Sequence, residues 1–162
     1  SRQYDDGLIH WFHAGHHTID AAQIPPLPED RGVLVDNPTP EWPVPADSPP
    51  VRVVVLEHSV PDGSVHWDLL VARGTRAEAL LWGIRCMERP DRDGSDIAIE
   101  AMSDHRPAWL RLEGEVSGDR GVVRRVASGL LERHGNTVII QWSDGRTSEW
   151  SIVGMCLRLG PG

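Results

Sequence analysis

With 162 residues, the chain is long enough for one domain with a sizeable core and too short for two of ordinary size. Apolar residues make up 40% and charged residues 25%, as in soluble globular proteins, and no apolar run is long enough to span a membrane. The formal net charge of −8 argues against indiscriminate binding to polyanions, because general affinity for nucleic acids comes from neutralised phosphates. Any chemistry on nucleic acids must therefore use local positive charge, which arginine supplies throughout this lysine-free chain.

The beginning of the chain contains no basic stretch followed by an apolar one, so we expect no secretion signal. The two cysteines, Cys86 and Cys156, lack the Cys-x-x-Cys spacing of a metal site. We expect both to be reduced and buried, because a domain of this size does not need a disulfide. These features predict a cytoplasmic protein, which we expect to be monomeric.

The first 22 residues form a histidine-rich segment that contains His10, His13, His16 and His17. Helical spacing would place three of these histidines on one face, so a second metal site is conceivable. Gly15 weakens a helix at this position, and we favour a non-ligand role for all four.

Residues 23–50 contain nine of the thirteen prolines. Each proline removes a backbone donor and fixes φ, so we expect an extended connector here. Leu34, Val35 and Trp42 are the side chains by which it would wrap onto the domain.

From residue 51 to 160 the pattern is that of β-strands. β-Branched runs and alternating runs are separated by Gly- and Asp-containing turns such as Pro61-Asp62-Gly63. The expected strands lie within residues 51–58, 65–72, 78–86, 108–116, 120–129, 136–142 and 147–159. The sequence therefore predicts a mostly β fold, a compact antiparallel β-barrel, with one or two short helices at 75–80 or 94–102.

The first group with chemical potential is "HSVPDGSVHWDLL". On a strand, His66 and Asp68 share a face at a spacing of roughly 7 Å, and His58 can approach them across the hairpin turn. Two imidazoles and one carboxylate suit a Mn, Fe or Zn ion with open coordination positions. The alternative is a surface hairpin whose polar side chains only face water.

The second group is "SDHRPAWLRLEGEVSGDRG", residues 103–121. A histidine and arginines on a loop, such as His105 and Arg106, can contact a phosphate, with the imidazole as proton donor or clamp. The alternative is a solvated turn followed by an ordinary hairpin.

Taken together and in this order, the two groups resemble the 3′-phosphoesterase domain of bacterial DNA ligase D and its stand-alone homologues. That family has approximately "KHDA…LHYDLRLE" followed by "DHPLDYADFEGEIPEGEYGAG", and the resemblance covers residues 51–145. It implies a compact β-barrel and a divalent metal, most often manganese, with zinc or iron as alternatives. The implied activity removes 3′-phosphates or 3′-ribonucleotides from nucleic-acid ends in DNA repair. The implied partners are those ends and DNA-repair ligase or polymerase proteins.

The resemblance implies a role for individual residues. The metal ligands fall on His58, His66 and Asp68, and the phosphate-contacting histidine falls on His105, followed by Arg106. Trp109 stands where the family has tyrosine.

The chain departs from the family two residues after the metal aspartate, where Leu70 replaces a phosphate-clamping arginine. A leucine cannot donate a hydrogen bond to a phosphoryl group, which such a reaction requires. Arg85, Arg106 or Arg120 would have to replace it from a neighbouring strand or loop.

Two other functions remain open at this stage. The chain can be a catalytically silent relative, a metal-containing binding or scaffold module in DNA repair. It can also be a mononuclear iron oxygenase with two histidines and one carboxylate on a different β-barrel. We find no later histidine–arginine pattern of the kind expected for such an oxygenase.

Overall fold

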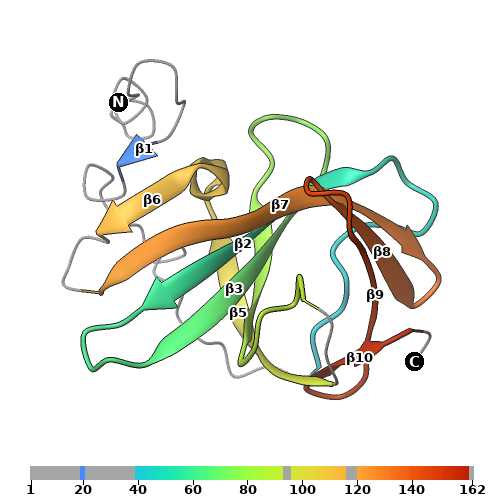
Figure 1. Ribbon diagram of the computed structural model, residues 1–162. Helices are drawn as coiled ribbons and strands as arrows, with labels where there is room; N and C mark the ends of the chain where they lie inside the picture. The colour runs from blue at the N-terminus through green and yellow to red at the C-terminus, as the bar shows by residue number, and fades with distance from the viewer. Residues whose placement is uncertain (1–18, 21–38, 93–95, 116–119, 161–162) are drawn as a thin grey trace.

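The computed structural model describes residues 19–20, 39–92, 96–115 and 120–160 (Figure 1). It confirms the mostly β fold and the antiparallel barrel. Eight strands close on one another in the order β2, β3, β4, β5, β10, β9, β8 and β7, and β7 pairs again with β2. Their bounds are β2 Val51–Ser59, β3 Val65–Ala72, β4 Leu81–Cys86, β5 Ile97–His105, β7 Val122–His134, β8 Thr137–Trp142, β9 Thr147–Ile152 and β10 Cys156–Leu159.

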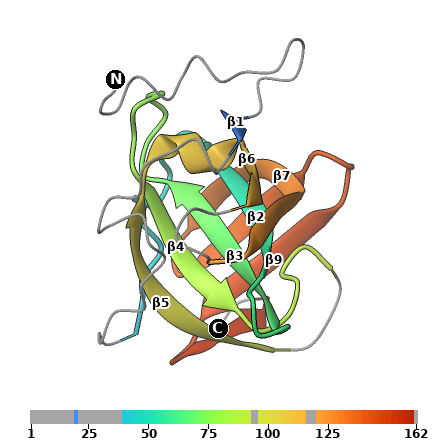
Figure 2. The same ribbon diagram turned by 90° about the vertical axis from the view of Figure 1, so that its left-hand side faces the viewer.

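Two short strands extend the barrel at one edge. β6 (Leu112–Glu115) pairs antiparallel with the first part of β7, and β1 (Ile19–Asp20) pairs parallel with β6. The 3₁₀ turn η4 (Pro107–Leu110) connects β5 to β6 and lies over the outside of the barrel (Figure 2). Within the described ranges, no helix is long and apolar enough to cross a membrane.

Strands β2 and β3 are buried on both faces. Register pairs place Val54 opposite Leu70 on one face, and Val53 opposite Val71 on the other. All four side chains are buried. Because side chains alternate along a strand, one face contributes to the main core and the opposite face must be covered by another layer. That layer includes η4, whose Leu110 carbonyl accepts a hydrogen bond from the Arg125 guanidinium at 3.0 Å.

The prolines of residues 39–50 keep this segment extended, and it packs on the barrel as expected for Trp42. The Trp42 ring lies 5.4 Å from that of Trp82, and Val44 is also buried. Arg133 of β7 donates hydrogen bonds to the carbonyl oxygens of Trp42 and Val44. The segment is therefore part of the folded unit up to the start of β2. The N-terminal histidines, Leu34 and Val35 lie outside the described residues.

The prediction of short helices at 75–80 or 94–102 was wrong in position. Residues 75–80 form bends and turns, and Ile97–His105 is strand β5. Ile97 and Ile99 alternate with exposed neighbours, so period-two burial against β4 and β10 overrides the helical propensity of Ala, Glu and Met. The strand expected over 108–116 is shorter than predicted. Its first residues belong to the 3₁₀ turn η4, and only Leu112–Glu115 form a strand, β6.

Both cysteines are free, as expected. The expectation that both are buried is confirmed for Cys86 and wrong for Cys156, which is partly exposed.

Barrel closure depends on Gly129 of β7, which pairs with Val53 of β2 and with Trp142 of β8. A Cβ atom at this position would overlap the Gln141 carbonyl oxygen, which belongs to the backbone and cannot rotate away. We predict that Gly129→Ala lowers the free energy of unfolding by about 1 to 3 kcal/mol in chemical denaturation. Gly74→Ala is the matched control, because a Cβ there meets no atom within 4 Å. Equal stability of the two variants would contradict this account of closure.

Candidate metal centre

Three side chains from one β-hairpin converge on the outer layer of the barrel. The β2–β3 register places His58 directly opposite His66, and Asp68 follows His66 by two residues on the same face. One ligand atom from each of the three lies within 4.8 Å of the others. The group formed by His58, His66 and Asp68 can therefore hold a metal ion, as the sequence predicts.

The distances are those of a compact polar cluster. His66 Nε2 lies 3.4 Å from Asp68 Oδ1, and His58 Nδ1 lies 3.9 Å from Asp68 Oδ2. The two imidazole rings meet edge to face with their centroids 4.7 Å apart. The side chains are only 7 to 13% exposed, so the hairpin does not simply present them to water. The alternative of a solvated hairpin is therefore wrong.

His58 is oriented by the backbone of a distant loop. Its Nε2 lies 2.6 Å from the carbonyl oxygen of Arg120, which can only accept, so Nε2 carries the proton and donates. This leaves the Nδ1 lone pair directed at the cluster. Metal-bound histidines commonly donate their second ring N–H to a carbonyl in this manner, which fixes the tautomer and the ring.

The remaining ligand atoms also fit a cation. His66 Nε2 and Asp68 Oδ1 are buried and make no well-aligned hydrogen bond among the described residues, although Arg85 Nε lies 3.5 Å from Asp68 Oδ1. Buried polar atoms without partners are costly in a native fold and call for an explanation such as an ion. Two imidazole nitrogens and a carboxylate oxygen form a donor set that suits Mn, Fe or Zn.

Burial sets the protonation of the group. It raises the pKa of Asp68 to about 7, although the positive charge of Arg85 acts in the opposite direction. Burial, followed by the charge of Arg85, lowers the pKa of His66 to about 3. Burial is also the main reason that the pKa of His58 is lowered. Both imidazoles are therefore neutral at pH 7, which is the form that binds metals.

An arginine lies beside the carboxylate, although it is not at the position that the family would use. Leu70 is fully buried and its Cδ2 packs against Gly83, so it belongs to the core. Arg85 of β4 is the register partner of Asp68, and its Nε lies 3.5 Å from Asp68 Oδ1. Of the three arginines considered as replacements, Arg85 is thus positioned next to the group.

His105 lies at the end of β5 and is almost completely covered. It is 2% exposed, and its ring meets that of Trp109 edge to face at 5.2 Å. Burial lowers the pKa of His105 to about 4, while a backbone hydrogen bond to Ser103 acts in the opposite direction. The charge of Arg85 lowers the pKa of His105 as well as those of His58 and His66. The charge of Arg120 acts in the same direction on His58 and His105, so both arginines influence the two groups that the sequence singled out.

The sequence predicted phosphate contacts for Arg106, Trp109 and Arg120, but the contacts that the structure shows for these residues are with the protein itself. Arg106 is the buried residue at the start of η4, and Trp109 is buried within η4. Arg120 provides its carbonyl oxygen to His58. This last role could not be assigned from residue type, because it uses the backbone. The one signal is Gly121, whose positive φ and close approach to the Ser59 carbonyl bring this loop against the end of β2.

Comparison of the chain with protein-family models, with curated proteins and with solved structures found no match.

We predict that His66→Ala weakens Mn²⁺ binding to metal-free protein, measured by calorimetry. The loss in affinity should exceed the roughly 10- to 100-fold that follows when a residue that only orients a metal ligand is removed. His134→Ala is the control, because this histidine is on β7, is half exposed and lies outside the group. Unchanged affinity in His66→Ala would exclude the centre.

Metal binding should also weaken as the pH falls. Asp68 has a raised pKa of about 7, so below that pH a proton must leave before a cation can bind. We expect the Mn²⁺ affinity to fall about tenfold per pH unit below pH 7, while the two histidines stay neutral. Asp68→Asn should bind more weakly and lose this dependence in titrations from pH 8 to 6. A dependence that persists in Asp68→Asn would show that another group competes with the metal.

Proposed function

We propose that this chain is a divalent-metal-dependent phosphoesterase that processes nucleic-acid 3′ ends, of the type found in bacterial DNA ligase D. The observation that supports this most directly is the position of Arg85, whose guanidinium lies beside a group that can hold a cation. A metal ligand set and an adjacent arginine together match the negative charge of a phosphoryl group. The motif order of the sequence supports the choice of 3′ ends.

The hairpin holds the ion in this proposal. His58 and His66 provide neutral imidazole nitrogens and Asp68 provides a carboxylate oxygen, which leaves coordination positions for water and substrate. A bound divalent ion supplies Lewis acidity toward a phosphoryl oxygen and lowers the pKa of a bound water. The choice of manganese rests on the resemblance.

Arg85 takes over the clamp that Leu70 cannot provide. It extends from β4, one strand away from Asp68, and its side chain is 18% exposed. From there the guanidinium can donate to phosphoryl oxygens on which negative charge develops, which is a major source of rate enhancement in phosphoryl transfer.

His105 does not act as a positively charged proton donor in this proposal. With a pKa of about 4 it is neutral at pH 7, and it is covered by Trp109. A neutral, fixed imidazole positions its neighbours and can donate a hydrogen bond without supplying positive charge. Arg85 is therefore the principal positive charge next to the centre.

The silent relative is the second candidate. Burial of the positions at which the family contacts phosphate favours this candidate. Leu70 is fully buried, and Trp109 and His105 are nearly so. In that case the chain binds metal and nucleic acid but does not release phosphate.

A primer with a 3′-phosphate or one 3′-ribonucleotide, incubated with Mn²⁺, tests the proposal. We expect release of the terminal group by the wild type, and a loss on the order of 100-fold in rate for Arg85→Met. Mn²⁺ affinity is measured in the same variant above pH 8, because losing Arg85 removes a repelling charge but also the charge that lowers the pKa of Asp68. The loss of rate should persist at Mn²⁺ concentrations that saturate the variant. The control is Arg73→Met, since Arg73 is exposed and ion-paired with Asp104. No release by wild type that binds Mn²⁺ would favour the silent relative.

A further inference from the structure

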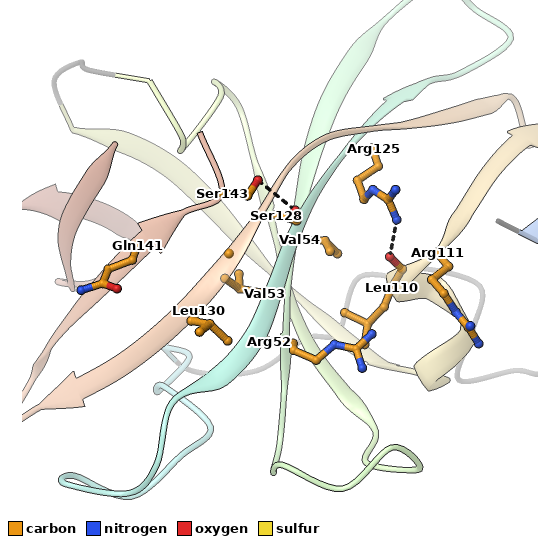
Figure 3. A pocket seen from close by; sticks show the side chains of 11 residues that line it. Arg52, Val53, Val54, Leu110, Arg111, Arg125, Ser128, Leu130, Gln141 and Ser143 are labelled. Atoms are coloured by element: carbon orange, nitrogen blue, oxygen red, sulfur yellow. Dashed lines mark hydrogen bonds between the residues drawn. The ribbon is translucent and has the colours of Figure 1, made fainter. Parts of the chain in front are cut away.

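A hollow lies where β2, β7 and η4 meet, with a volume of about 470 Å³ (Figure 3). Its floor includes Val54 and Leu110, and its walls carry three arginines together with serine and glutamine side chains. The lining residues are Arg52, Val53, Val54, Leu110, Arg111, Arg125, Ser128, Gly129, Leu130, Gln141 and Ser143. The metal ligands are not among them.

The hollow is positively charged in an acidic protein. Its lining contains three arginines and no carboxylate. The Arg125 guanidinium donates to the Leu110 carbonyl, and the Arg125 backbone N–H donates to the Glu113 carboxylate at 3.2 Å. Burial, and to a lesser extent the charge of Arg52, lower the pKa of Arg111. Arginines gathered around one hollow raise the local positive potential, which attracts anionic ligands.

The hollow and the metal centre lie on the same face of the barrel. Arg125 of β7 is the register partner of Leu56, and Leu56 is the register partner of Asp68. With strands about 4.8 Å apart, Arg125 is about 10 Å from Asp68 across the sheet. Arg52 and His58 are six residues apart on the same face of β2, which corresponds to about 20 Å along the strand.

We propose that this arginine-lined hollow binds the phosphate backbone of the single nucleic-acid strand whose 3′ end reaches the metal centre. The inference rests on the proposed function for the direction of the strand. A stacked strand rises about 3.4 Å per nucleotide, so the distance from His58 to Arg52 accommodates about six nucleotides.

The composition of the hollow favours contacts to the backbone over contacts to bases. No aromatic side chain lines it, so it offers no surface on which bases can stack. Arginine forks match phosphate oxygens, and Ser128, Ser143 and Gln141 can donate to phosphate or sugar. Binding should accordingly be independent of base sequence and sensitive to salt.

The experiment measures binding without turnover. Fluorescently labelled single-stranded oligonucleotides of three and twelve nucleotides are titrated with full-length protein in EDTA at several salt concentrations, and anisotropy is recorded. We expect the longer strand to bind more tightly, and Arg52→Gln to remove most of that gain. The variant should also reduce the slope of log affinity against log salt by about 0.7, as expected for one lost phosphate contact on a single strand.

Arg158→Gln is the matched control, because it removes the same charge from an exposed arginine of β10, a strand that pairs with neither β2 nor β7. It should leave affinity and salt slope near the wild-type values, and thermal unfolding checks that both variants are folded. Equal effects of the two variants, or no effect of Arg52→Gln, would overturn the proposal.

His66→Ala separates this inference from the proposed function. It should bind the oligonucleotide in EDTA as the wild type does, because the hollow contains no metal ligand. Normal, Arg52-dependent binding by a protein that never releases a 3′ group would reject the phosphoesterase and retain the hollow. Release of the 3′ group without Arg52-dependent binding would reject the role of the hollow and retain the phosphoesterase.

Discussion

The pairing register of β2 with β3 is the constraint on which the candidate centre depends. His58 meets His66 only in this register, and a slip of one residue would turn one member of the pair to the opposite face. The turn between the strands fixes the register. Gly63 takes a positive φ, and Asp62 accepts hydrogen bonds from the backbone and the hydroxyl of Ser64. Burial on both faces of the strands opposes any slip as well, since it would expose apolar side chains.

The same burial explains the chemistry of the group. A carboxylate and two imidazoles placed in a hairpin with apolar surroundings lose their hydration, so each is pushed toward its neutral form. The free-energy cost of burying these polar groups is confined to one end of the hairpin, because the rest of β2 and β3 beyond Asp68 is mainly apolar. Arg85 compensates part of the cost through its charge. Polar groups kept in such a place are typical of functional sites.

Charge is distributed unevenly around this arrangement. The chain has a net charge of −8, yet the face that bears His58 and Asp68 also bears Arg85 on one side and Arg125 on the other. Glu100 is the register partner of Arg85, and the Glu113 carboxylate accepts a hydrogen bond from the Arg125 backbone N–H, so these arginines are interspersed with carboxylates.

The sequence by itself determined the barrel class, most of the strands and the membership of the metal group. Those features depend on local alternation and on a short hairpin, and both are visible in "HSVPDGSVHWDLL". It misplaced the short helix, because Ile97–His105 becomes a strand only through pairing with β4 and β10. Only the tertiary structure decided that Arg85 lies beside Asp68, and that Arg120 provides its carbonyl oxygen to His58. Cross-strand neighbours and backbone contacts between distant segments are set by the closure of the sheet, which local patterns do not encode.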